Sequence, residues 1–144
     1  MVKILMCSLA LLSSVALAQD VQTVSVTMTD SLGSVLGSLS MMDAPAPYFG
    51  DPNWNKDYSP SVIILPRLDG LPAGSIKIDV LKSTSCASLE GPADKTALIS
   101  VDDSGLATHP VSLSNSTLAE LVGRIVVLKG GTPYHTLACG AVTN

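Results

Sequence analysis

Apolar and polar side chains alternate along most of the chain, and clusters of turn-forming residues separate the alternating segments. Residues 21–28, with the sequence VQTVSVTM, place Val24, Val26 and Met28 on one face. A period of two is typical of a β-strand that buries one face. The same pattern predicts further strands at residues 34–41, 61–65, 75–81, 97–101, 106–113, 123–128 and 137–142. About eight strands without a long helix indicate an all-β sandwich or flattened barrel of antiparallel strands.

Short turns are predicted between several of these strands. Residues 102–105 (DDSG) are turn-forming, so residues 97–101 and 106–113 are expected to form a hairpin. Pro110 has no backbone N–H, which indicates that the second of these strands is an edge strand or is interrupted. Residues 116–121 begin with a helix-capping residue type and are expected to form one helical turn.

A long loop is predicted at residues 43–60, where four prolines and several acidic and amide residues follow no period. Four of the five aromatic residues of the chain lie in this loop: Tyr48, Phe49, Trp54 and Tyr58. Aromatic side chains on a loop over a rigid sandwich form many binding surfaces, so this loop is the candidate binding surface. The alternative is that the loop folds back and buries these rings against the sandwich.

The first eighteen residues have the features of a secretory signal peptide. Lys3 gives a basic start, residues 4–12 are apolar, and residues 15–18 (VALA) form a small-residue cleavage site. The apolar run is too short to cross a bilayer. We therefore expect residues 1–18 to be removed and residues 19–144 to form one secreted domain.

The charge of the mature chain argues against two classes of partner. Removal of Lys3 leaves seven basic and twelve acidic residues, which gives a formal charge of −5. Such a charge suits neither nucleic acid nor an anionic membrane. Residues 138–144 contain no hydrophobic anchor tail. The expected product is soluble and extracellular, with another extracellular protein or a ligand as its partner, and the sequence also allows a homodimer.

The expected export also bears on whether the cysteines are oxidised to a disulfide. Loss of the signal peptide removes Cys7 and leaves Cys86 and Cys139. In an oxidising compartment two remaining cysteines most simply pair with each other, although two separate buried thiols are the alternative. Closing a loop of about fifty residues removes unfolded-state entropy equivalent to about 4 kcal/mol.

Four stretches of the chain, in their order and spacing, resemble a known family. They are residues 70–74 (GLPAG), Cys86, residues 103–107 (DSGLA) with residues 118–131 (LAELVGRIVVLKGG), and residues 137–142 (LACGAV). Together they resemble the copper/zinc superoxide dismutases over nearly all of the mature chain. The resemblance implies a Greek-key β-sandwich in which the Cys86–Cys139 bridge is the family disulfide.

The resemblance also implies where metal ligands would lie, and the residues at those positions are unsuitable. Asp79 and Leu81 stand at two copper-histidine positions, and Lys129 stands at a third. Residues 87–100, which face the bridging and zinc ligands, contain no histidine, and Thr136 replaces an arginine that guides superoxide. A redox-cycling copper site needs several imidazoles held together, so we expect neither catalytic metal nor another cofactor.

Shortened loops point in the same direction. Residues 86–97 leave little room for a zinc loop, and residues 132–136 leave little for an electrostatic loop. A sandwich that keeps its strands and loses its catalytic loops is expected to act as a non-catalytic structural or binding module. Two alternatives remain: an enzyme or copper-binding protein with a relocated site around His109 and His135, and a generic extracellular adhesion or ligand-binding sandwich.

Lys77 and Lys129 allow a further alternative, an anion site at the former copper position. The favoured interpretation is a solvated strand face, because residues 75–81 alternate branched apolar residues with Lys77 and Asp79, which predicts that the charged side chains face water.

Asn115 begins the sequence Asn-Ser-Thr, which is an N-glycosylation sequon in an exported protein. Outside a eukaryotic secretory route the same residues are simply the start of a helix.

Overall fold

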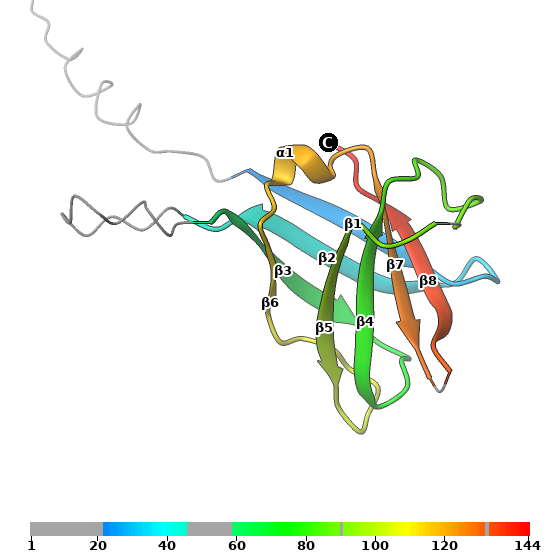
Figure 1. Ribbon diagram of the computed structural model, residues 1–144. Helices are drawn as coiled ribbons and strands as arrows, with labels where there is room; N and C mark the ends of the chain where they lie inside the picture. The colour runs from blue at the N-terminus through cyan, green and yellow to red at the C-terminus, as the bar shows by residue number, and fades with distance from the viewer. Residues whose placement is uncertain (1–21, 46–58, 90, 132) are drawn as a thin grey trace, which may run out of the picture.

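Eight antiparallel strands and one short helix form the folded part of the chain (Figure 1). The structure is a computed structural model, and it describes residues 22–45, 59–89, 91–131 and 133–144. The predicted signal peptide and the four aromatic residues of the candidate binding loop lie outside the described residues. The strands are β1 (Thr23–Thr29), β2 (Val35–Asp43), β3 (Ser61–Leu68), β4 (Gly74–Leu81), β5 (Lys95–Val101), β6 (Val111–Ser114), β7 (Ile125–Gly130) and β8 (His135–Ala141), and helix α1 (Leu118–Leu121) precedes β7.

The strands belong to one sheet with the order β5-β4-β7-β8-β1-β2-β3-β6. The sheet curls so that its two end strands, β5 and β6, come into contact and nearly close a flattened barrel (Figure 1). Strand β7 lies beside β4 rather than beside β6, which precedes it in the sequence. This return of the chain to an earlier strand is a Greek-key connection. The predicted all-β fold class is therefore confirmed.

The predicted hairpin between the fifth and sixth strands is wrong. The turn itself forms, because the Asp102 carboxylate accepts hydrogen bonds from the backbone N–H groups of Ser104 and Leu106. The strands nevertheless diverge after it, since β5 pairs with β4 and β6 pairs with β3. Strand β6 begins only after Pro110, as its missing N–H predicts.

The main core fills the barrel with side chains from the alternating strands. In β1 the predicted face Val24, Val26 and Met28 is buried, and the intervening threonines and serine are exposed. Leu118 and Leu121 of α1 cover one end of this core. Burial of so many apolar side chains is the principal stabilising contribution to a domain of this size.

A close backbone approach at Gly140 brings β8 against β1. A Cβ atom at this position would lie 2.3 Å from the backbone oxygen of Thr27. Only glycine fits at such a distance, and it allows the ladder contact between Thr29 and Cys139 that joins the two halves of the sheet.

Candidate functional site

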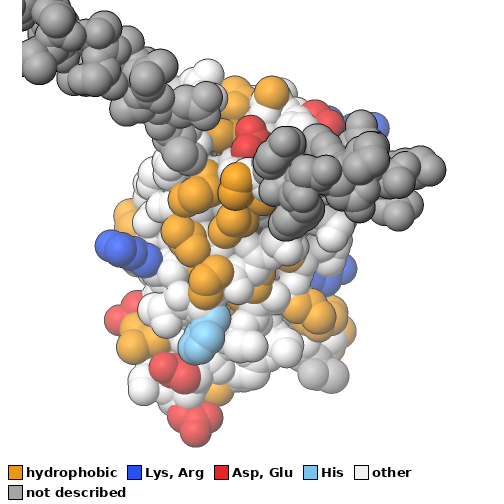
Figure 2. Space-filling view, turned by 90° about the vertical axis from the view of Figure 1, so that its left-hand side faces the viewer, with side chains coloured by type: hydrophobic (Ala, Val, Ile, Leu, Met, Phe, Trp, Pro, Cys, Tyr) orange, Lys and Arg blue, Asp and Glu red, His pale blue; other side chains and the backbone are white. Residues whose placement is uncertain are grey.

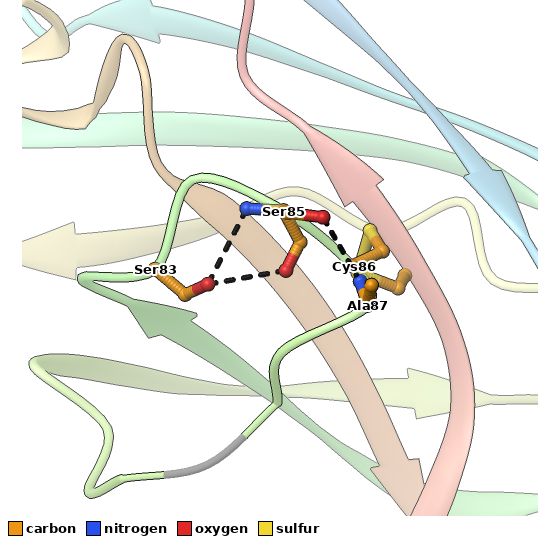
Figure 3. The surroundings of a disulfide bond; sticks show 5 residues. Ser83, Ser85, Cys86 and Ala87 are labelled. Carbon is orange, nitrogen blue, oxygen red and sulfur yellow. Dashed lines mark hydrogen bonds between the residues drawn. A yellow bond between two sulfur atoms is a disulfide. The ribbon is translucent and has the colours of Figure 1, made fainter.

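A disulfide joins Cys86, in the segment after β4, to Cys139 in β8 (Figure 3). The two Cα atoms are 5.9 Å apart, and the bridge spans 53 positions of sequence. Local hydrogen bonds shape the segment before it: the Ser83 hydroxyl donates to the carbonyl of Ser85, and the Ser85 hydroxyl accepts from the N–H of Ala87. The pairing predicted from export and cysteine number is confirmed.

The bridge fastens the segment after β4 over the outer face of β4, β7 and β8, and we call its described residues, 82–89 and 91–94, the disulfide loop. Beneath this loop lies a second apolar cluster, separate from the main core, made of Leu81, Ile125 and Val127. Leu89, Ala93 and Cys139 pack against it from outside. Leu81 is therefore an apolar packing residue at a position where the resemblance implies a copper ligand.

Asp79 lies next to this cluster, and its side chain is only 1% exposed. The nitrogens of Lys77 and Lys129 approach the same carboxylate oxygen, Oδ2, at 3.5 and 3.2 Å. The other oxygen, Oδ1, accepts a hydrogen bond of 2.9 Å from the Thr96 hydroxyl. The prediction that Asp79 faces water is wrong, because its carboxylate is buried and engaged by two lysines and the Thr96 hydroxyl.

In the ion triad Lys77–Asp79–Lys129, the carboxylate lowers the repulsion between two neighbouring lysines. Lys77 and Lys129 stand directly opposite each other in the β4–β7 ladder, where like charges repel. The Asp79 carboxylate between them offsets that repulsion and links β4 to β7, while Thr96 adds a link to β5. The Lys77 nitrogen also lies 5.6 Å from the centre of the Tyr134 ring, within range of a cation–π contact.

These residues do not fit copper or zinc. An ammonium group has no lone pair to donate, and leucine has no donor atom. Asp79 is the only suitable oxygen donor among the three ligand positions, and it is already engaged by two lysines and a hydroxyl. Thr136, where the resemblance implies a guiding arginine, is exposed and uncharged at the start of β8.

The two histidines are exposed and lie in different parts of the barrel. His109 is in the connection between β5 and β6, and His135 opens β8 with its Nδ1 atom 3.4 Å from the carbonyl of Pro133. Within the described ranges, no group of three or more histidine, cysteine, aspartate or glutamate residues is placed to hold a metal ion.

Among the grooves on the outer surface of the described residues, the two largest have no motif in the sequence, because each combines residues from several elements of the fold. One, of about 550 Å³, lies beside the disulfide and is lined by Thr27, Thr29, Asp30 and residues of β8 including Thr136. The other, of about 820 Å³, runs over β2 and β3 past Ser40, Arg67 and Leu106. Hydrophobic side chains gather on the β3 and β6 side of the molecule (Figure 2).

Asn115 is exposed in the turn between β6 and α1 and adopts a left-handed backbone conformation, with φ at 51°. The third sequon residue, Thr117, caps α1 by accepting a hydrogen bond from the N–H of Glu120. The predicted helical turn is thus confirmed.

Fold and site together define an all-β, disulfide-bridged, nearly closed barrel with a Lys–Asp–Lys triad on its outer face. No protein-family model matches the chain, and no curated protein matches it either. Among the described residues, no helix is long and apolar enough to span a bilayer.

Proposed function

We propose that this chain is a secreted, non-catalytic domain of the copper/zinc superoxide dismutase type that acts as a structural or binding module. The Greek-key strand order supports this assignment, since the resemblance implies that order. The Cys86–Cys139 bridge supports it further. Each of the two cysteines lies in a stretch that carries the resemblance, and the resemblance implies that they are bonded to each other.

The proposal that the domain is non-catalytic rests on the side chains found at the positions where the resemblance implies copper ligands. Asp79 is buried and paired with Lys129, itself at a ligand position, and Leu81 is packed beneath the disulfide loop. Rebuilding a copper site here requires removal of the lysine and displacement of the loop, as well as new imidazoles. The residues present therefore favour packing over redox chemistry.

The binding role draws on the two grooves of the outer surface. The larger groove, over β2 and β3, combines hydroxyls of Ser38 and Ser40 with the exposed guanidinium of Arg67 and the apolar Leu106. A concave surface with apolar walls and a few polar groups suits an extracellular protein or small ligand.

Metal analysis after reconstitution tests this proposal. Purified mature protein is incubated with copper and zinc salts, dialysed, and assayed for bound metal and for superoxide consumption. We expect substoichiometric copper and a rate no higher than that of a His109→Gln/His135→Gln double variant. Stoichiometric copper with rapid superoxide turnover would overturn the proposal.

Electron paramagnetic resonance of the copper-loaded protein distinguishes the proposed non-catalytic domain from the alternative with a relocated copper site. Imidazole couplings that are present in the native protein and absent from the double histidine variant would assign copper binding to His109 and His135, against the proposal.

A further inference from the structure

The barrel has one seam at which neighbouring described strands contact each other without pairing. Strand β5 pairs only with β4 and β6 only with β3, although β5 and β6 lie side by side (Figure 1). Unpaired strand edges are templates for edge-to-edge association. The short β6 behind Pro110 is poorly suited to such pairing, whereas β5 has seven residues and carries Leu98, which is 57% exposed.

Asn115 is located at one end of this seam. It follows Ser114, the last residue of β6, and its backbone carbonyl accepts a hydrogen bond of 2.5 Å from the nitrogen of Lys95, the first residue of β5. The left-handed conformation of this turn suits asparagine, which tolerates positive φ better than most residues. A group attached to Asn115 would therefore lie at this end of the seam.

Among the described residues, the side chain of Asn115 is engaged through its oxygen and not through its nitrogen. Its oxygen Oδ1 accepts a hydrogen bond from the Ser59 hydroxyl. Its nitrogen Nδ2 donates to none of the described residues. Nδ2 is the atom through which asparagine carries a glycan in a sequon.

We propose that Asn115 carries an N-linked glycan that shields the β5–β6 seam from association with other chains. In the transfer, Nδ2 attacks the anomeric carbon of an oligosaccharide on a lipid diphosphate donor. A C–N bond forms, the anomeric C–O bond breaks, the lipid diphosphate leaves, and Nδ2 loses one proton. The glycan is bulky and hydrophilic, so it hinders close approach to the seam. The inference rests on the export that the proposed function includes, and it does not depend on the absence of catalysis.

Expression of the full chain in a eukaryotic secreting cell tests attachment. We expect the secreted protein to lose mass on treatment with peptide N-glycosidase, and an Asn115→Asp variant to show no such loss. A Thr117→Ser variant keeps both the sequon and the hydroxyl cap of α1, and it is expected to retain the glycan.

Light scattering at a temperature just below unfolding tests shielding. Peptide N-glycosidase converts the acceptor asparagine to aspartate, so the enzyme-treated protein and the Asn115→Asp variant have the same polypeptide. Both are expected to aggregate faster than the glycosylated protein. The matched control adds Ser25→Asn to the Asn115→Asp variant, which creates a sequon with Thr27 on the exposed face of β1, away from the seam.

Each outcome bears on a defined part of the inference. Secretion without a glycan overturns attachment while leaving the proposed function intact, whereas retention in the cell without a glycan overturns the export on which both rest. Equal aggregation rates with and without the glycan overturn shielding. Equal protection by a glycan on β1 also overturns it, because general solubility would then explain the effect.

Discussion

Strands β1 and β4 share the same alternating sequence pattern, but their outward side chains differ in exposure to solvent. On β1, the alternate side chains Thr23, Ser25 and Thr27 are exposed to solvent. On β4, the corresponding outward side chains Asp79 and Leu81 are buried. Both strands show a period of two, but on β4 the disulfide loop packs over Leu81, and Asp79 is paired with two lysines. Alternation therefore determines which side chains share a face. Contacts with segments distant in the sequence determine whether that face is exposed to solvent.

The comparison also separates two kinds of apolar packing. The main core is enclosed by the strands of the barrel and, at one end, by α1, so its burial follows from the fold itself. The second cluster of Leu81, Ile125 and Val127 is small and is covered by a loop of irregular structure. Regions with few buried contacts open more easily than the core, so the cover of this cluster depends on the bridge that fastens it.

Removal of the disulfide is expected to have the largest effect. In a Cys86→Ser/Cys139→Ser double variant the unfolded chain regains its loop entropy, and the free energy of unfolding falls by about 4 kcal/mol. Urea unfolding measures this loss, and amide hydrogen exchange locates its structural effect. We expect exchange to rise most in residues 82–94 and β7, with β1 and β2 rising only through global unfolding. Uniform acceleration over both regions would show that the loop and the core open as one unit.

Paired truncations compare the two apolar clusters directly. Leu39→Ala, in the main core, is expected to destabilise the domain by about 3 kcal/mol, and Leu81→Ala, in the second cluster, by about 2 kcal/mol. The smaller value follows because the disulfide loop can settle into the space left by Leu81, whereas the sheet around Leu39 cannot. Urea midpoints of the two variants measure the difference. An equal or greater loss at Leu81 would contradict the idea of a relaxed, separately covered cluster.

The strand periods and the disulfide could be predicted from the sequence because both follow from local or countable features. The valines of β1 alternate with small polar residues, and only two cysteines lie outside the predicted signal peptide. The class of fold followed from the number and length of these periods. Strand partners are less predictable: the turn at Asp102 forms, yet β6 pairs with β3, because tertiary packing overrides a favourable turn sequence.

The candidate site was harder to foresee. The residue types Asp79, Leu81 and Lys129 could be read directly, and from them we predicted that the copper positions of the resemblance lack ligands. Their contacts could not, because the partners Thr96 and Tyr134 come from other strands and turns and show no motif. Burial of an outward-facing aspartate depends on contacts far apart in the sequence, which a period of two does not encode.

Neutralising Asp79 tests the ion triad. Asp79→Asn keeps the size of the side chain but leaves Lys77 and Lys129 facing each other without a carboxylate, so we expect a loss of about 2 kcal/mol. Added salt should restore part of this loss by screening the two ammonium groups. The matched control, Asp103→Asn, makes the same charge change on an exposed turn and is expected to stay within about 0.5 kcal/mol of the native protein. Equal effects at Asp79 and Asp103 would show that the triad contributes nothing.

The smallest effect is expected where the disulfide loop ends. Arg124, before β7, donates a hydrogen bond to the Asp94 carboxylate, and this contact holds the pKa of Asp94 below its ordinary value, with further electrostatic contributions from Lys82 and Lys95. Because the folded pKa is the lower one, the contact stabilises the protein above the unfolded pKa, and this contribution is lost as pH falls through the folded pKa.

Urea midpoints at about pH 6 and below about pH 4 measure this contribution. Arg124→Gln should remove part of the stability at the higher pH and therefore flatten the acid dependence, whereas Arg67→Gln, an exposed arginine on β3, should leave the slope unchanged. An equal change of slope in both variants would assign the acid dependence to overall charge. A change confined to Arg124→Gln would show that the covered face of the barrel, and not the open one, carries the pH-sensitive contact.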